Sequence, residues 1–118
     1  MNIEGKVAVI TGGASGLGRA TAEMVIAKGG KVAVLDLNEE LAQATAAELG
    51  EAKAYQVNVT DDASVTKAIE GVRSDFGAIH INVNCAGIGA ASRTVGKDGA
   101  LDINKFNFIV QVNLIGTF

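Results

Sequence analysis

A glycine-rich segment near the start of the chain has the residue types and spacing to bind a phosphate group. Residues 11–18 read Thr-Gly-Gly-Ala-Ser-Gly-Leu-Gly and follow a run rich in β-branched residues. Glycines permit a sharp turn and let backbone N–H groups approach a pyrophosphate, which would lie at the positive end of the following helix. A tight turn without a ligand remains the alternative for this segment taken alone. The residues that we expect to contact a pyrophosphate are Gly12, Ser15, Gly16, Leu17 and Gly18.

An acidic residue, Asp36, stands at the end of the next run of β-branched residues. Its separation from the glycines is close to the roughly 20 residues expected for an acid that binds the adenosine ribose of a dinucleotide. The carboxylate can accept hydrogen bonds from both ribose hydroxyls, and its charge would repel a 2′-phosphate. Ala14 and Leu37 occupy positions where an NADP site would need Arg or Lys. We therefore predict NAD rather than NADP, with a solvated strand-end acid as the alternative for Asp36 alone.

Other reactive side chains give weaker indications. His80, the only histidine, has no cysteine or carboxylate cluster beside it, which favours a packed or partly exposed strand residue over a metal ligand or a general base. For Cys85, the only cysteine, an inert small residue is favoured over a reactive thiol. We predict no metal site. Three basic residues could meet the phosphates of a CoA substrate, although a solvated loop and helix start is the favoured interpretation; they are Arg93, Lys97 and Lys105.

Positioning the glycines and Asp36 requires alternating strands and helices, and the apolar pattern supplies them. The sequence predicts strands at 6–11, 31–36, 52–57 and 79–84, with helices at 17–28, 38–49 and 61–75. Asn38 and Asp61 are expected helix caps. A polar loop from 87 to about 100 precedes a helix that is expected to run from 102 to the end of the chain. This order predicts a Rossmann-like doubly wound α/β fold with four parallel strands in the order 3-2-1-4, and an unrelated α/β arrangement is the alternative.

Composition narrows the class of protein. A chain of 118 residues with 48% hydrophobic and 19% charged residues is typical of one globular domain. The net charge of −3 offers no basic excess for a nucleic-acid backbone, and no apolar run is long enough to cross a membrane. One cysteine excludes an internal disulfide. Because the first residues lack the layout of a signal peptide, we expect a cytoplasmic protein.

Three segments resemble motifs of the short-chain dehydrogenase/reductase family. Residues 11–18 resemble its Thr-Gly-xxx-Gly-x-Gly motif, and residues 84–87 (Asn-Cys-Ala-Gly) resemble the Asn-Asn-Ala-Gly motif after its fourth strand. Residues 112–116 (Val-Asn-Leu-Ile-Gly) resemble the segment that carries its catalytic asparagine. In finer detail these stretches, and the loop after residue 87, are similar to the branch of the family that acts on 3-hydroxyacyl-CoA in fatty acid metabolism.

The resemblance implies roles by position. Asn113 would be the asparagine of the Asn-Ser-Tyr-Lys tetrad and would hold a water in the proton relay. A buried structural asparagine that bridges backbone groups is the alternative for Asn113. The remaining cofactor contacts implied are Leu37 near the adenosine, Asn58 and Val59 beside the adenine, and Cys85, Ala86 and Gly87 along the nicotinamide-side ribose.

This sequence departs from the family pattern at several of these positions. Asn58 stands where an aspartate is usual, although its side-chain oxygen could still accept from the adenine amino group. His80 stands where Asp is frequent, and Asn82 where an apolar residue is usual. Cys85 replaces the second Asn of the motif, a change shared with the hydroxyacyl-CoA branch.

The resemblance also implies an activity that these residues cannot complete. The family transfers hydride between the nicotinamide and a secondary alcohol or ketone, with a tyrosine and a lysine in a Tyr-x-x-x-Lys motif. Here the sole tyrosine is Tyr55, and Val59 stands four residues later. We therefore expect residues 1–118 to be the N-terminal dinucleotide-binding part of a single domain, inactive alone and aggregation-prone because its fourth strand would be an unprotected edge.

Three interpretations of the complete protein remain. The first is a 3-hydroxyacyl-CoA dehydrogenase that takes a small-molecule substrate and forms a homotetramer. The second is another short-chain reductase, acting on steroids or on 3-oxoacyl carrier protein. The third is a non-catalytic module that senses NAD.

Overall fold

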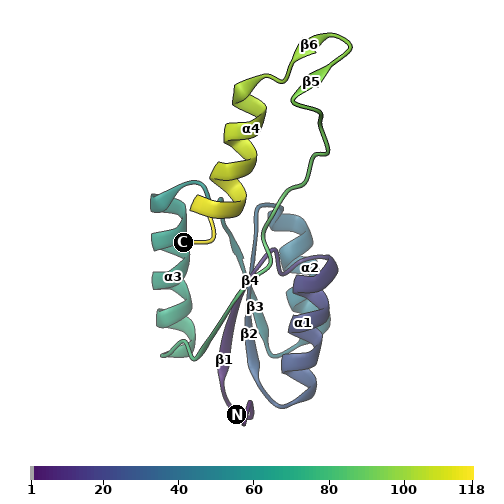
Figure 1. The fold of residues 1–118 in the computed structure, drawn as a ribbon. Coiled ribbons are helices and arrows are strands. Elements are labelled where there is room, and N and C mark those ends of the chain that lie inside the picture. The colour runs from purple at the N-terminus through teal and green to yellow at the C-terminus, as the bar shows by residue number, and fades with distance from the viewer. Residues whose placement is uncertain (1) are drawn as a thin grey trace.

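The computed structural model describes residues 2–118 (Figure 1). Strands and helices alternate through most of the chain, and a small hairpin and a final helix follow. The elements are β1 (Val7–Thr11), α1 (Gly16–Ala27), β2 (Lys31–Asp36), α2 (Glu39–Leu49), β3 (Ala52–Gln56), α3 (Asp62–Phe76), β4 (Ile81–Asn84), β5 (Val95–Gly96), β6 (Gly99–Ala100), α4 (Ile103–Val110) and the π-helical turn η1 (Gln111–Ile115).

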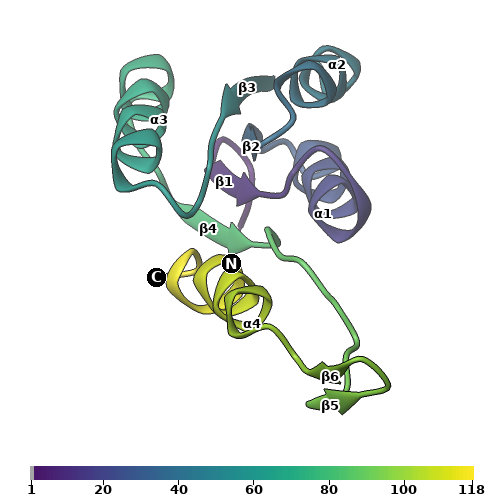
Figure 2. The same cartoon turned by 90° about the horizontal axis from the view of Figure 1, so that it is seen from above.

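The four main strands form one parallel sheet in the order β3-β2-β1-β4, which confirms the predicted order. Figure 2 shows α1 and α2 on one face of this sheet and α3 on the other. β4 is an edge strand and pairs only with β1 among the described residues. The fold is therefore a Rossmann-like doubly wound α/β arrangement, in which the carboxyl ends of all four strands meet at one edge of the sheet.

Two apolar clusters hold the helices to the sheet. On the face of α1 and α2, Ile10 and Val34 pack with Ala22 and Ala46. On the face of α3, Val9 and Leu35 pack with Val72. The side chains of β1 and β2 are almost all buried, as expected for central parallel strands covered on both faces. The two strands that carry Thr11 and Asp36 are therefore the most deeply buried strands of the sheet.

Local capping signals operate as predicted. The Asn38 side chain accepts from the backbone N–H of Leu41 at 3.0 Å, and Asp61 accepts from that of Ala63 at 3.1 Å. Both side chains satisfy helix N–H groups that have no partner inside the helix. Gly77 ends α3 in the left-handed region with φ of 80°. Asn38 and Asp61 thus begin the helices that follow β2 and β3, and Gly77 ends α3 before the chain returns to the sheet in β4.

His80 accounts for a late start of β4. The predicted strand began at 79, whereas β4 begins at Ile81. The ring Nδ1 of His80 accepts from the backbone N–H of Val7 at 3.1 Å, and the His80 N–H donates to the Val7 carbonyl at 2.9 Å. The imidazole thus takes the place of a backbone carbonyl at the first step of the β1–β4 ladder. His80 thus pairs with β1 but lies just before β4 and is exposed, so it is not itself a packed strand residue.

The region after β4 differs most from the prediction. The loop contains the short hairpin β5–β6, which projects away from the sheet (Figure 1). The prediction of one helix to the chain end is wrong. α4 ends at Val110, and the chain continues as η1, in which the Gly116 N–H donates to the Gln111 carbonyl at 2.8 Å. The wider turn lets Gly116 pack against Val59, where a side chain would collide.

Candidate functional site

A cavity of about 470 Å³ opens at the carboxyl ends of the strands. Ligands of open α/β sheets bind at this edge, where strand order reverses between β1 and its neighbours. The structure brings every predicted cofactor contact into the lining of this one cavity: Gly12, Ser15, Gly16, Leu17, Gly18, Asp36, Leu37, Asn58, Val59, Cys85, Ala86 and Gly87. We propose them below as the contacts of a dinucleotide cofactor.

In the glycine turn, backbone segments approach one another so closely that a side chain at Gly12 or Gly18 would collide with them. Gly12 has φ of 62°, and a Cβ there would lie 2.9 Å from the backbone nitrogen of Ala86. A Cβ on Gly18 would collide with the Gly12 carbonyl group. Gly16 has φ of 52° and faces open space. Gly12 and Gly18 therefore allow close packing, while Gly16 leaves the mouth of the turn open.

The start of α1 keeps hydrogen-bonding groups free at the cavity. Ser15 is the N-cap residue, yet its side chain makes no capping hydrogen bond. Unpaired N–H groups in the first turn of a helix attract anions. Leu17 is 82% exposed beside them, which is unusual for a leucine in a packed helix. The local sequence thus builds an anion-binding end with an apolar flank.

Asp36 is held in a defined orientation at the end of β2. Its Oδ2 accepts from the Ala14 N–H at 3.2 Å, and its Oδ1 accepts from the Asn38 N–H at 3.1 Å. Neither Arg nor Lys lines the cavity, so this carboxylate meets no cation there. The two backbone donors orient the carboxylate and leave lone pairs on both oxygens.

Thr11 connects the glycine turn to the segment after β4. Its Oγ1 accepts from the backbone N–H groups of Cys85 and Ala86, both at 3.2 Å. This hydroxyl holds residues 85 and 86 against Gly12; these two residues line the cavity, whereas Thr11 itself does not. Thr11 was not among the predicted site residues, although its place as the first residue of the glycine motif could have indicated a structural role.

Asn113 joins η1 to the loop that follows β4. Its Oδ1 accepts from the Ile88 N–H at 2.8 Å, and its Nδ2 donates to the Ile88 carbonyl at 2.7 Å. Both ends of the amide are thus paired with one backbone residue, as in the bridging alternative above, although Asn113 is exposed rather than buried. Asn113 does not line the cavity. Its role in a proton relay stays a prediction.

Two apolar residues of the last helical segment close one side of the cavity. Phe108 of α4 and Val112 of η1 both line it, and sequence reasoning missed them. No local signal could have found them, because their place depends on how α4 docks against the loop after β4.

The remaining reactive side chains lie elsewhere. His80, Arg93, Lys97 and Lys105 are absent from the cavity lining, and Cys85 is half-buried in it. Within residues 2–118 the structure gathers no cluster of three potential metal ligands. Over the same residues, no helix combines the length and apolarity needed to cross a membrane.

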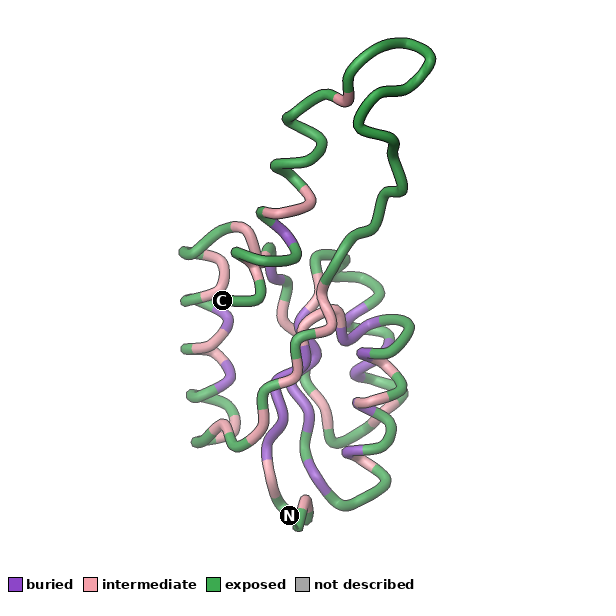
Figure 3. Tube along the Cα trace, viewed as in Figure 1, coloured by how far each residue is buried: buried purple, intermediate pink, exposed green. Residues whose placement is uncertain are grey.

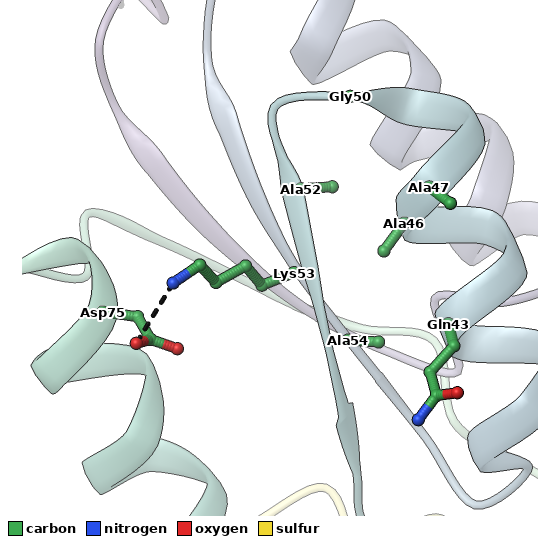
Figure 4. A pocket seen from close by; sticks show the side chains of 8 residues that line it. All are labelled: Gln43, Ala46, Ala47, Gly50, Ala52, Lys53, Ala54 and Asp75. Atoms are coloured by element: carbon green, nitrogen blue, oxygen red, sulfur yellow. Dashed lines mark ion pairs between the residues drawn. The ribbon is translucent and has the colours of Figure 1, made fainter.

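A second pocket of about 370 Å³ lies at the β3 edge of the sheet (Figure 4). Four alanines of α2 and β3 line one side, and Lys53 pairs with Asp75 on the other at 3.1 Å. Asp75 also accepts from the Tyr55 hydroxyl at 2.6 Å. The bonds from Tyr55 and Lys53 lower the pKa of Asp75, while burial and the Asp75 carboxylate raise the pKa of Tyr55 well above its usual range. These groups satisfy one another and link β3 to α3, so we interpret this pocket as structural.

Known proteins resemble this chain in sequence and in structure. A family-level comparison matches residues 6–118 to "short chain dehydrogenase". The chain is 42% identical over 99% of its length to 3-hydroxyacyl-CoA dehydrogenase type-2 of Bos taurus, and 39% identical over 100% to the 3-oxoacyl-[acyl-carrier-protein] reductase of Escherichia coli. It covers 46% and 47% of those proteins, so it spans about half the length of the curated relatives that it matches.

A solved structure agrees with this relationship. The 3-ketoacyl-(acyl-carrier-protein) reductase from Brucella melitensis, complexed with NADH, superposes with a TM-score of 0.89 at 35% identity. The match covers 98% of this chain and 46% of that one. Because the family match extends over nearly all of the sequence and the strand order, glycine turn and cavity fit it, the chain belongs to the short-chain dehydrogenase family.

Proposed function

We propose that this chain binds NAD in the cavity at the carboxyl ends of the strands, as the dinucleotide-binding part of an NAD-dependent oxidoreductase. One observation carries the proposal: the glycine turn, the free start of α1 and the oriented carboxylate of Asp36 all open into one cavity. In a dinucleotide the pyrophosphate is joined to the adenosine ribose. Its binding site therefore needs a glycine turn and a helix start for the pyrophosphate, next to an acid for the ribose.

Each group of lining residues corresponds to one part of the dinucleotide. The pyrophosphate would lie on the N–H groups at the start of α1, near Ser15. The adenosine ribose would bond to Asp36, with Leu37 and residues 58–59 at the base. Residues 85–87, held by Thr11, would run along the nicotinamide-side ribose. We propose residues 1–118 as the N-terminal part of one short-chain dehydrogenase domain.

We propose that the complete protein oxidises a secondary alcohol or reduces a ketone, with a 3-hydroxyacyl-CoA as the favoured substrate. When bound, NAD supplies the hydride acceptor. The residues described here bind and orient it, and Asn113 fixes the loop at the nicotinamide end by holding the Ile88 backbone. The bovine relative named above supports an acyl-CoA substrate, and the bacterial relative supports an acyl-carrier-protein substrate as the alternative.

Titration of the full-length protein with NAD and NADP tests the cofactor assignment. We expect NAD to bind at least about tenfold more tightly, because a 2′-phosphate would face Asp36 with no cation in the lining. Asp36→Ala should weaken NAD binding and remove most of this preference. Calorimetry would measure both constants. Tighter binding of NADP by the unaltered protein would overturn the assignment of Asp36.

A substrate panel separates catalysis from NAD sensing. We expect the full-length protein to reduce NAD with a 3-hydroxyacyl-CoA, measured by the absorbance of NADH. Turnover of 3-hydroxyacyl carrier protein alone would favour the alternative substrate. NAD binding without turnover of any secondary alcohol would favour a sensing module instead.

A further inference from the structure

One polar side chain is completely buried in the part of the chain that the structure describes, and it belongs to none of the sites described so far. Thr45 of α2 is 0% exposed and lies beside Ala42 and Ala46, on the face of the helix that packs against the sheet. A hydroxyl in such apolar surroundings costs free energy unless it forms a hydrogen bond. The partner of this hydroxyl therefore indicates why a polar residue stands at this position.

The Thr45 hydroxyl bonds to the glycine turn rather than to its own helix. Its Oγ1 donates to the backbone carbonyl of Ala14 at 3.3 Å. Thr21 of α1 shows the usual local alternative, because its Oγ1 donates to the carbonyl of Leu17, four residues earlier in the same helix. Within residues 2–118 the Ala14 carbonyl accepts no other hydrogen bond, and Ala14 is only 1% exposed. Thr45 is thus the donor that satisfies this buried carbonyl.

The bond from Thr45 fixes the direction of a second group, the backbone N–H of Ser15. The Ala14 carbonyl and the Ser15 N–H belong to one planar peptide unit, and no peptide bond of the described chain is cis. In a trans peptide these two groups point in opposite directions. Because the carbonyl is turned toward α2, the Ser15 N–H is turned away from it. Over residues 2–118 this N–H makes no hydrogen bond, and Ser15 lines the proposed NAD cavity.

Side chains hold the peptide units on both sides of Ala14. The Ala14 N–H donates to the Asp36 Oδ2 at 3.2 Å, while the Ala14 carbonyl accepts from Thr45. Asp36 thus fixes the unit before Ala14, and Thr45 fixes the unit that leads into Ser15 and α1. In the proposed complex Asp36 bonds to the adenosine ribose and the Ser15 N–H faces the pyrophosphate. Loss of the Thr45 bond should therefore affect recognition of the pyrophosphate and leave recognition of the ribose intact.

We propose that Thr45 is a positioning residue for cofactor binding, whose hydroxyl holds the Ala14–Ser15 peptide unit so that the Ser15 N–H stays unpaired and turned toward the pyrophosphate. The inference rests on the proposed binding of NAD in this cavity. Thr45 acts from the buried face of α2 through the backbone, since it is not among the lining residues. Without the hydroxyl the buried carbonyl loses its donor, and the peptide unit can turn toward another one.

Three substitutions at Thr45 separate the effect of the hydroxyl from that of side-chain size. Thr45→Val replaces the hydroxyl by a methyl group, whereas Thr45→Ser and Thr45→Ala differ from each other only by the hydroxyl. Calorimetry on the full-length protein gives the dissociation constants of NAD and ADP-ribose, which contain the pyrophosphate, and displacement of NAD gives that of adenosine, which does not. We expect Thr45→Val to weaken binding of NAD and ADP-ribose about fivefold and to leave adenosine binding unchanged. Thr45→Ser should bind NAD about as tightly as the unaltered protein, and Thr45→Ala about fivefold more weakly than Thr45→Ser.

Thr66→Val is the matched control, because it makes the same chemical change at an exposed residue of α3 outside the cavity lining. It should leave all three dissociation constants unchanged. Circular dichroism checks that each variant is folded, and the serine and alanine variants carry the test if the valine variant misfolds. Equal NAD binding by the serine and alanine variants overturns the inference alone, and so does an equal loss of NAD and adenosine binding, which would indicate a general distortion of the fold. Absence of NAD binding by the unaltered protein overturns the proposed function and the inference with it.

Discussion

The first βαβ unit, residues 7–36, and the segment from residue 85 to the chain end contribute opposite sides of the same cavity but are built differently. β1 and β2 bury nearly every side chain, and Ile10 and Val34 are completely inaccessible. In contrast, α4 buries no side chain and η1 buries only Val112. Figure 3 shows this change from buried to exposed along the trace. Large apolar side chains stand exposed in the second region: Ile103, Phe106, Phe108, Leu114, Ile115 and Phe118.

This difference teaches that the two sides of the cavity are stabilised by different forces. Apolar burial holds the glycine turn and Asp36 in place. A few polar contacts, chiefly those of Thr11 and Asn113, hold the loop after β4 and the helix beyond it. Segments with few buried apolar contacts open first. We therefore expect the pyrophosphate and ribose end to be rigid and the nicotinamide end to open locally.

The largest effect should come from removing apolar volume in the first region. Ile10→Ala should lower the free energy of unfolding by about 4 kcal/mol, because it leaves a cavity between β1 and the helices of one face. The same change at Ile103, which is 63% exposed, should cost less than about 0.5 kcal/mol. Urea denaturation monitored by circular dichroism measures both. Equal losses would contradict the contrast between the two regions.

Backbone approach at the glycine turn gives the next largest effect. Gly18→Ala should lower the free energy of unfolding by about 3 kcal/mol and abolish NAD binding, since the new methyl group would displace the Gly12 carbonyl. Gly89→Ala is the control in the second region, where an added Cβ meets no atom within 4 Å. It should change neither stability nor binding. Retained NAD binding in the Gly18 variant would refute the close-packing role.

The polar attachment of η1 can be tested separately from the core. Asn113→Ala removes two hydrogen bonds to Ile88. It should lower the free energy of local opening of this segment by about 2 kcal/mol. Amide hydrogen exchange should accelerate at Ile88 and in α4 and η1, while β1 and β2 stay protected. Asn107→Ala, the same change on the exposed surface of α4, should leave exchange unaltered. Uniform acceleration in both regions would show that they unfold as one unit.

The smallest effect concerns Tyr55, which lies in neither region and reports on the β3 edge. Burial and the bond to Asp75 raise its pKa above the value of about 10 found in unfolded chains. The neutral form therefore stabilises the fold below about pH 10, and this contribution is lost as the pH rises toward the raised pKa. Since Tyr55 is the only tyrosine of residues 1–118, tyrosinate absorbance of this 118-residue chain follows it alone.

In that titration, Asp75→Asn should bring the pKa of Tyr55 closer to its usual value. Tyr55→Phe should remove its contribution to the loss of stability in alkali. A tyrosine that titrates near pH 10 in the folded, unaltered protein would show that the hydroxyl is not held by Asp75.

The sequence predicted those parts of the site that depend on neighbours along the chain. The glycines of residues 12–18 need a special backbone whatever the rest of the fold does. Asp36 at a strand end and the caps Asn38 and Asp61 act within a few residues of their own position. Alternating apolar periods were enough to predict parallel strands with helices on both faces, and the glycine turn followed by Asp36 indicated the Rossmann-like strand order.

Other features required contacts that sequence spacing does not encode. The imidazole of His80 pairs with Val7, and the Thr11 hydroxyl pairs with residues 85 and 86, across more than seventy positions of chain. The π-helical turn η1 depends on how Gly116 packs against Val59. Even the short-range bonds from Thr60 to Asn58 were missed, because several donors compete for one amide oxygen and only the folded turn shows which of them bond to it.

By itself, the sequence determined an α/β sheet with a glycine turn and an acidic strand end, since both follow from backbone sterics and from the period of apolar residues. Only the tertiary structure decided which side chains meet across the cavity, where the last helix changes its turn, and which polar groups remain free. The physical reason is that hydrogen-bonding groups are assigned by competition among all partners within reach, and folding determines which partners those are.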